Sequence, residues 1–581
     1  MSQFSFATVP TISVPRHAFD MGHTVTTSLK VGKLTPIDVM EVIPGDTFKI
    51  KCKWLARLTS AYLAPVMDNA FLDTFHFWVP LRLLYTEYES VFGNPSLDAY
   101  EDNGLGSFPT FPGSITIPEK TVGDYLGLAT KVALPRKLSL MKYRAFALVY
   151  DNYFRNENVT QPMRVQRGEY VASEAPNNNP WSPSNYTGQL PNITKLADYF
   201  TSCLPAPQKG KAVDVLASGQ APLTASVDLN GIPVDISSPA PGGSGLPGVN
   251  YFRPFIGGAN GGNIPVPALF GPGATSGVPY NKLSSFSTSA SLSSGSPAYL
   301  SLEASTTTTS PTPIDGYATI SSFNVNDLRF AVQYQKMLEK DARGGSRYFS
   351  YLTAHYGVRV PFISIGVPEY LGGAHTPLAL QQVAQTAPDF NEDTGAGVGT
   401  LAAFSQTTGH SRFTKGFYEH GYILTCAAVR YHHTYQQGID RSWFRSKRED
   451  FYDPLFATLG EQPVFKAQLY AAGQSGVDIW DSAPFGYQEY GAEYRYMPSI
   501  VTGEARSNAL NSFDVYHFAD NYANAPSLNS QFIDETDTFF RRTTRIYDHS
   551  TVDDFIVQFY FSGYAYRAMP VRSIPSLLDH H

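Results

Sequence analysis

Alternating hydrophobic and polar positions mark a strand near the start of the chain. Within Asp46–Leu58 (DTFKIKCKWLARL), every second residue is Phe, Ile, Cys or Trp, and lysines stand between them. This alternation predicts a half-buried strand whose outer face carries Lys49, Lys51 and Lys53. Such a row of lysines either contacts DNA or faces solvent, and solvent is the commoner case.

Three further runs have the character of strands. The segment Asp73–Leu83 predicts a strand that ends at Pro80, because proline cannot continue the hydrogen-bond ladder of a central strand. Gly421–Tyr431 predicts another, and Asp554–Arg567 (DFIVQFYFSGYAYR) is the clearest of the set. Strands before and after an inserted region, with few helices between them, predict a mainly β fold, a β-sandwich with long loops.

Three segments have the period of an α-helix and carry a polar cap, a glycine stop or both. They are residues 139–154 with Ser139 as the cap, residues 326–342 with Asn326 as the cap and Gly344-Gly345 as the stop, and residues 346–355 ending at Gly357.

The chain changes character between about Ala212 and Ser322, where Ser, Gly, Pro and Thr dominate and Arg253 and Lys282 are the only basic residues. Aromatic residues are scattered through this stretch, which a disordered linker rarely retains. We therefore expect an ordered surface insertion with flexible tips. The expected organisation is an extended arm over residues 1–45, a first part of the core with helical insertions over 46–211, the insertion over 212–322, and a second part of the core with helices and a C-terminal arm over 323–581.

Composition favours a protein that hides much of its surface. Charged residues make up 16% of the 581 residues, against about 25% in soluble domains. Interfaces favour Tyr and Phe, of which there are 36 and 38, and they contain little Lys and Glu. Either the chain contacts many other chains or it is a large β-rich monomer with uncharged loops. The net charge of -7 argues against a protein that neutralises nucleic acid unaided.

Features of secretion and membrane insertion are missing from the sequence. The N-terminus has no basic start followed by an apolar run, and no stretch reaches about 18 apolar residues. Cys52, Cys203 and Cys426 are odd in number and widely spaced, so we expect buried or free thiols. These features predict a protein made and folded in a cytoplasm.

Motifs of catalysis are also missing. The sequence has no GxSxG elbow, Walker A loop, HExxH or CxxC pair. Residues 548–550 (DHS) are neighbours, so their side chains cannot converge as a catalytic triad and a turn is expected. Residues 432–433 (HH) would point to opposite faces of a strand, and residues 391–393 (NED) lack a defined cation-binding template. We expect no enzyme activity and no cofactor.

Clusters of basic residues with aromatic neighbours suit single-stranded nucleic acid, through phosphate contacts and base stacking. The three clusters are residues 441–448 (RSWFRSKR), residues 539–545 (FFRRTTR), and Arg567 with Arg572. Each either contacts DNA or pairs with carboxylates of another subunit, and Glu449, Asp450 and Asp453 favour pairing for the first. The candidate DNA contacts are Arg541, Arg542, Arg545 and Arg567.

Blocks of sequence spanning most of residues 15–517 resemble, in order, those of the gokushovirus branch of microvirus major capsid proteins. The blocks are VPRHAFDMGHTVTTSLKVGKLTPIDVMEVIPGDTFKI, WVPLRLL, YRAFALVYDNYFRNEN, YQKMLEKDARGGSRY, HYGVR, PEYLGG, YEHGYILTCAAVRYHHTYQQGIDRSWFR, GEQPVF and FGYQEYGAEYRYMPS. The match is weakest over residues 205–320, where such proteins are expected to vary.

The resemblance implies an eight-stranded antiparallel jelly roll and a small T=1 icosahedral capsid of about 60 copies, built through pentamers. It implies a circular single-stranded DNA genome, a small basic DNA-binding protein, an internal scaffolding protein and a DNA pilot protein as partners. The insertion is expected to protrude near three-fold axes and to contact a receptor on the host cell. The candidates for this protrusion are Tyr251, Phe252, Phe255, Phe270 and Tyr280.

Two other classes of protein compete with a capsid protein. A β-sandwich hydrolase acting on carbohydrate would need a pair of acidic residues, and none stands out. A fibre-like adhesin would favour internal repeats, and we find none. The size of the purified protein separates the classes, because a capsid protein should form pentamers or shells.

Overall fold

The structure is a computed structural model whose chain divides into two compact units, residues 1–212 with 335–581, and residues 213–334. It describes residues 15–92, 106–111, 114–134, 138–163, 167–168, 188–211, 213, 219–227, 251–252, 302–303, 312–320, 325–345, 347–359, 361, 366–384, 401–472, 483–545 and 551–572.

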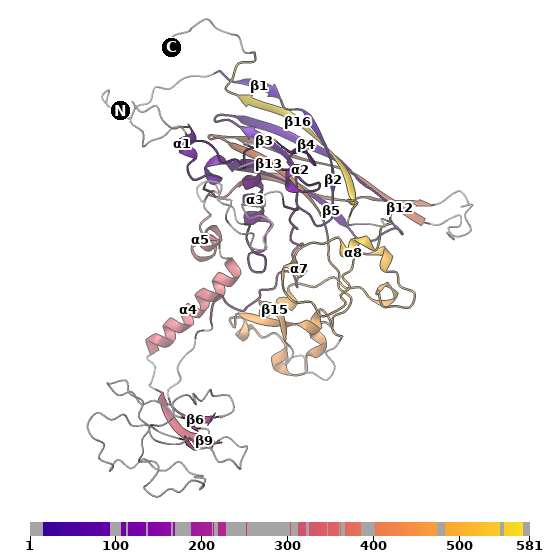
Figure 1. Ribbon diagram of the computed structural model, residues 1–581. Helices are drawn as coiled ribbons and strands as arrows, with labels where there is room; N and C mark the ends of the chain where they lie inside the picture. Colours follow the sequence, from indigo (N-terminus) through magenta and orange to yellow (C-terminus); the bar gives the residue numbers. More distant parts are fainter. Residues whose placement is uncertain are drawn as a thin grey trace, which may run out of the picture. The chain divides into compact units, whose positions relative to one another are not determined.

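Two antiparallel sheets dominate the larger unit (Figure 1). The first follows the order β1-β16-β4-β12-β11, with β2 also paired to β16, and the second follows the order β10-β5-β13-β3. The bounds of these strands are β1 His17–Asp20, β2 His23–Leu29, β3 Thr35–Val42, β4 Thr47–Leu58, β5 Ala70–Pro80, β10 Glu369–Pro377, β11 Leu380–Ala384, β12 Leu401–Gly416, β13 Gly421–Tyr431 and β16 Phe555–Arg567.

Strand pairing in the two sheets is nested. β2 pairs with β16, β3 with β13, β4 with β12 and β5 with β10. Successive pairs alternate between the sheets, so the chain folds as one long hairpin wound into a sandwich. This is the topology of an eight-stranded jelly roll. The expected mainly β fold is confirmed.

The core between the sheets follows the alternation in the sequence. In β4, Phe48, Ile50, Cys52 and Trp54 are at most 3% exposed, and the lysines between them are exposed. They pack in one hydrophobic cluster with residues of the opposite sheet such as Trp78. The half-buried strand predicted from this alternation is confirmed.

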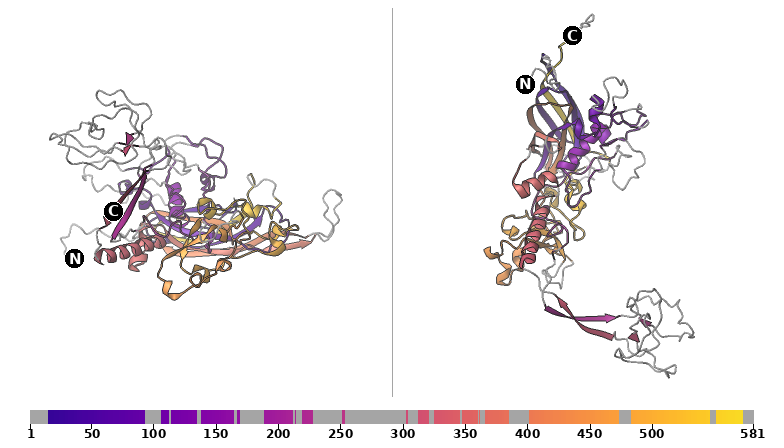
Figure 2. Two further views of the ribbon diagram at one scale, coloured as in Figure 1. Left: turned by 90° about the horizontal axis from the view of Figure 1, so that it is seen from below. Right: turned by 90° about the vertical axis from the view of Figure 1, so that its left-hand side faces the viewer.

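Both faces of the second sheet are covered, because helix α3 (Met141–Tyr153) lies against it (Figure 2). Phe75 and Phe77 of β5 face this helix, with ring centroids 4.8 Å from Phe154 and 4.7 Å from Tyr153. These side chains belong to a second hydrophobic cluster beneath the sheet. The outer face of the first sheet has no comparable cover among the described residues, and exposed side chains project from it.

The other predicted strands and helices are present with small shifts. β5 begins three residues before Asp73 and ends at Pro80 as expected, while β13 and β16 match their predicted ranges within one residue. Ser139 accepts a hydrogen bond from the Met141 amide at 3.3 Å, at the start of α3. The prediction of Asn326 as a cap is wrong, because α4 (Val325–Gly344) already includes it.

Glycines stop two helices, as expected. α4 ends at Gly344, and Gly345 follows with φ +85°; α5 (Tyr348–Tyr356) ends at Gly357, with φ +67°. These left-handed conformations favour glycine, because a β-carbon there would crowd the carbonyl oxygen of its own residue. A β-carbon on Gly345 would also lie 2.3 Å from Glu157 Oε1, whereas one on Gly357 would meet nothing within 4 Å.

Valine at Gly345 should therefore cost more stability than valine at Gly357. Both variants bear the left-handed strain of about 1–2 kcal/mol, and only Gly345→Val also displaces the Glu157 carboxylate. We expect a lower thermal midpoint for Gly345→Val, measured by calorimetry on unassembled protein. Equal midpoints for the two variants would show that the contact with Glu157 has no effect.

Shorter elements complete the larger unit. Strands β14 (Glu461–Phe465) and β15 (Pro484–Glu489) form a two-stranded antiparallel sheet. The short helices are α1 Tyr88–Phe92, α2 Val122–Tyr125, α7 Ser530–Ile533 and α8 Thr538–Arg541, with 3-10 helices η1 Leu81–Leu83, η3 Arg441–Phe444, η4 Arg448–Asp450, η5 Pro454–Phe456, η6 Lys466–Gln468, η8 Ala492–Tyr494, η9 Gly503–Ala505 and η10 Asp514–Tyr516. No helix among the described residues has the length and apolar character needed to cross a membrane.

The smaller unit contains two antiparallel strand pairs among its described residues. β6 (Gly219–Val227) pairs with β9 (Thr312–Ile320), and β7 (Tyr251–Phe252) pairs with β8 (Leu302–Glu303). Tyr251 and Phe252 thus lie in a strand, while Phe255, Phe270 and Tyr280 lie outside the described residues. The expected protrusion stays a prediction.

Candidate nucleic-acid interface

A row of basic side chains crosses the middle of the first sheet. Lys49, Lys51 and Lys53 of β4 point away from the core and are exposed, and Arg57 continues the row. The three lysines lie two residues apart and Arg57 follows four residues after Lys53, because alternate residues of a strand share one face. The strand therefore presents four positive charges on a surface that no described helix covers.

Strand register places aromatic and further basic side chains beside this row. Tyr564 of β16 lies opposite Lys49, and Tyr560 lies opposite Lys53. On the other side, β12 places Arg412 opposite Lys51. Paired residues point to the same face, so lysines stand between a column of tyrosines and a column that includes an arginine. Tyr560 and Tyr564 are 47% and 51% exposed, which leaves their rings open to a partner.

A hollow of about 400 Å³ opens on this face. Its lining includes Lys51, Lys53, His410, Gln558 and Tyr560. Among the described outward-facing residues of β4, β12 and β16, none is acidic. Phosphate contacts from lysine and arginine, together with bases stacked on tyrosine, are the chemistry that binds single-stranded nucleic acid. We call the exposed face of β4, β12 and β16 the basic sheet face.

The arginines predicted to contact DNA near α8 are mostly used within the subunit. Arg541 pairs with Asp537 at 2.5 Å. Arg542 donates to backbone carbonyls, among them that of Ala519 at 2.6 Å, and burial lowers the pKa of its guanidinium. Arg545 is exposed. DNA contact by these residues stays a prediction, for which Arg545 is the most accessible of the three.

Arg567, the last residue of β16, is also engaged. Its guanidinium pairs with Asp46 at 3.2 Å and lies 5.3 Å from the centre of the Phe48 ring. In the first basic cluster, Arg445 lies 3.4 Å from Glu493. Arg445 thus pairs inside the subunit, with a residue more distant in sequence than the neighbouring acids, and the pairing of this cluster with carboxylates of another subunit stays a prediction.

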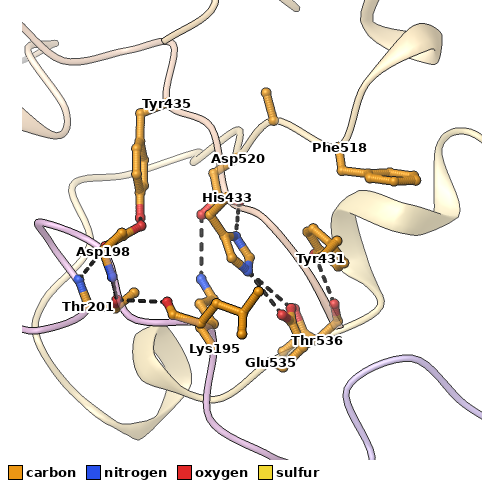
Figure 3. Close-up of polar contacts among 12 residues, drawn as sticks. Lys195, Asp198, Thr201, Tyr431, His433, Tyr435, Phe518, Asp520, Glu535 and Thr536 are labelled. Atoms are coloured by element: carbon orange, nitrogen blue, oxygen red, sulfur yellow. Dashed lines mark hydrogen bonds and ion pairs between the residues drawn. The ribbon is translucent and has the colours of Figure 1, made fainter. Parts of the chain in front are cut away.

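A buried network of charges lies away from this face, where β13 ends (Figure 3). His433 Nδ1 lies 2.7 Å from Asp520, and Nε2 lies 3.1 Å from Glu535. Lys195 lies 3.4 Å from the other oxygen of Asp520, and Tyr522 donates to that oxygen. The four charged side chains are at most 3% exposed. The network joins three segments that are distant in sequence.

The charges of this network determine its protonation. Burial alone would lower the pKa of His433, but Asp520 and Glu535 raise it to about 9. Burial likewise would raise the pKa of Asp520, but His433 and Lys195 lower it to about 2. With both ring nitrogens facing carboxylates, His433 is an imidazolium that donates two hydrogen bonds. Two cations and two anions therefore neutralise one another inside the subunit.

Other expectations about chemistry have mixed outcomes. His432 is exposed while His433 is buried, so the two histidines do point apart. No group of three or more potential ligands among the described residues is arranged to hold a metal ion. Cys52, Cys203 and Cys426 are free and buried, as expected. Residues 548–550 and 391–393 lie outside the described residues.

Comparison with known proteins decides the family. The family described as "Capsid protein (F protein)" matches residues 7–577. The chain belongs to this phage capsid family. Capsid protein VP1 of Chlamydia phage 1 is 35% identical, over 98% of this chain and 97% of the relative. Those of Bdellovibrio phage phiMH2K and Spiroplasma virus 4 are each 32% identical, over 99% and 97% of this chain and 98% and 96% of the relatives.

The resemblance to microvirus capsid proteins is thereby confirmed. The capsid protein is a structural component of a virion, and it assembles with copies of itself. The low content of charged residues, which left two alternatives open, fits a chain whose surface meets other chains.

Proposed function

We propose that this capsid protein forms a small T=1 icosahedral shell of about 60 copies, through pentamers, around a circular single-stranded DNA genome. The basic sheet face carries the proposal, because it combines exposed lysines, an arginine and tyrosines, and none of the described outward-facing residues of β4, β12 and β16 is acidic. In the shell this face is turned toward the genome. Assembly takes place in the cytoplasm of the bacterial host.

Other components follow from charge and from the family resemblance. A chain with a net charge of -7 repels a polyanion overall, so the genome requires a separate small basic DNA-binding protein. An internal scaffolding protein and a DNA pilot protein complete assembly and entry. The insertion over residues 212–322 contacts a host receptor, since exposed loops carry binding while a scaffold stays fixed.

Replacing Lys49, Lys51 and Lys53 with alanine should weaken single-stranded DNA binding and flatten its dependence on salt. Each lost phosphate contact lowers the slope of log K against log salt by about 0.7, so the slope should fall by roughly 2. The measurement is fluorescence anisotropy of an oligothymidylate with unassembled subunits, at low salt because binding without the basic protein is weak. Tyr560→Ala should lower affinity about tenfold with the slope unchanged, because stacking releases no counterions.

A matched control removes the same charge elsewhere. Lys209, Lys211 and Lys340 are exposed and lie outside the sheet, and their triple alanine variant should keep the wild-type slope. If both triple variants changed the slope equally, binding would depend on net charge alone. The basic sheet face would then be an ordinary solvated surface.

A further inference from the structure

An exposed group of aromatic side chains lies in the part of the larger unit that contains β15 (Figure 1). The ring of Tyr452 lies 5.9 Å from that of Tyr494 and 5.6 Å from that of Tyr490, and Phe456 lies 6.3 Å from Tyr490. We call aromatic patch the exposed side chains of Phe451, Tyr452, Phe456 and Tyr494, together with Leu455 and Met497, which are exposed and lie within three residues of these rings in the sequence.

The patch is held rigid from beneath. The Arg445 guanidinium lies 4.5 Å from the centre of the Tyr494 ring and 5.6 Å from that of Phe451, and only 11% of the Arg445 side chain is exposed. Gly491 has φ +75°, and a β-carbon there would lie 2.7 Å from the Tyr452 ring. A backbone turn and a buried cation thus fix the rings before any partner arrives, which lowers the entropy lost on association.

Charges around the patch are largely neutralised inside the subunit. Arg445 pairs with Glu493, and the Asp453 carboxylate accepts a hydrogen bond from the Leu455 amide at the start of η5. Asp450 accepts hydrogen bonds from the amides of residues 446 and 447. The six patch side chains themselves are aromatic and aliphatic, with tyrosine hydroxyls, and the exposed Lys447, Arg448 and Glu449 precede Phe451 with charges of both signs. This composition is that of an interface core, where aromatic residues and Met are enriched and Lys and Glu are rare.

The exposed area is large enough for a stable contact. Leu455 and Met497 are 82% and 93% exposed, and the four aromatic side chains are between 38% and 52% exposed. With about 200 Å² for each large side chain, the patch offers roughly 700 Å², close to the ~800 Å² that each partner buries in a standard interface. An apolar surface of this size promotes aggregation unless a partner covers it.

We propose that the aromatic patch is a contact between copies of this chain in the shell. A second copy is favoured over nucleic acid as its occupant, because the six patch side chains include no cation, Arg445 beneath them is paired with Glu493, and the exposed Lys447 and Arg448 are accompanied by Glu449. A second copy fits, since this chain belongs to a family whose members assemble with themselves and the patch area matches one side of such a contact. The inference rests on the proposed shell.

Thiol labelling tests the contact without disrupting it. The native cysteines are at most 5% exposed, and burial raises the pKa of Cys52 to about 12, so a new exposed thiol reacts selectively. Leu455→Cys and Met497→Cys should react with N-ethylmaleimide about tenfold more slowly in assembled shells than in unassembled subunits, if a packed interface excludes the reagent. The shells are produced in cells that supply the other phage proteins.

Three results would distinguish a failure of the patch contact from a failure of the proposed shell. Equal rates in shells and subunits would overturn the patch contact but leave the shell intact as a proposal. Protection from a bulky polyethylene-glycol maleimide alone, with fast labelling by N-ethylmaleimide, would mean enclosure without contact and would also overturn it. If the wild-type chain formed no shells at all, the proposed function itself would fail.

A disruptive pair of variants gives an independent measurement. The double variant Leu455→Asp, Met497→Asp should lower shell yield about tenfold, because a carboxylate that is buried without a partner at an interface is costly. Their high exposure predicts an unchanged melting temperature for the subunit. The matched control places aspartates at Met67 and Tyr418, which are 86% and 84% exposed outside the patch, and should assemble normally. Equal shell yields from the two double variants would overturn the proposal.

Discussion

An alanine at Asp520 should destabilise the folded subunit by about 3–5 kcal/mol, the cost typical of breaking a buried ion pair on one side. Asp520 is fully buried and lies between His433 at 2.7 Å and Lys195 at 3.4 Å. Without it, two buried cations retain only the carboxylate of Glu535. Water cannot replace the lost charge without opening the packing around β13 and α7.

The free energy of unfolding of unassembled subunits, from guanidinium titration, measures this loss. Asp520→Asn should cost less than Asp520→Ala, because the amide oxygen still accepts a hydrogen bond from His433. As a control, Glu504→Ala removes an exposed carboxylate in η9 and should change stability by no more than about 0.5 kcal/mol. An alanine variant that unfolds at the wild-type midpoint would contradict the role assigned to the network.

Local patterns in the sequence predict the elements well, because their signals lie within a few residues. The alternation in β4 indicates which side chains reach the core. Pro80 ends β5 because proline has no backbone N–H to donate to the strand ladder. Gly345 and Gly357 end their helices because both adopt positive φ. The prediction of Asn326 as the helix cap was wrong because α4 already begins at Val325. Local sequence rules do not predict a helix boundary to within one residue.

Contacts between distant segments could not be predicted from the sequence. The row of lysines in β4 was visible, but Tyr560 and Arg412 join it only through the register of β16 and β12, more than 350 residues away. The charge network has the same origin. In the sequence His433 is recognisable only as one of two adjacent histidines, because the residues it interacts with, at 195, 520 and 535, belong to no motif. Likewise, no local sequence pattern indicated that the Arg542 guanidinium donates hydrogen bonds to backbone carbonyls.

Raising the pH through 9 should weaken the subunit, because the network loses its imidazolium. The pKa of His433 is about 9 in the folded subunit and about 6.5 in the unfolded chain, so the folded state binds the extra proton between these values. The stability from this proton is complete below pH 6.5 and is lost as pH rises through 9. Between these limits the free energy of unfolding should fall by about 1.4 kcal/mol per pH unit, a total of about 3 kcal/mol.

Measurement between pH 7.5 and 9.5 isolates this effect from buried carboxyls. Burial raises the pKa of Asp534 to about 7 and that of Asp151 to about 6, so both are mostly ionised above pH 7.5. His433→Gln, which keeps one donor but cannot be charged, should be less stable at pH 7.5 and should show a flatter dependence on pH. The difference between the two proteins removes contributions from groups such as Lys33, whose pKa burial lowers. Parallel curves for wild type and His433→Gln would show that the imidazolium does not stabilise the fold.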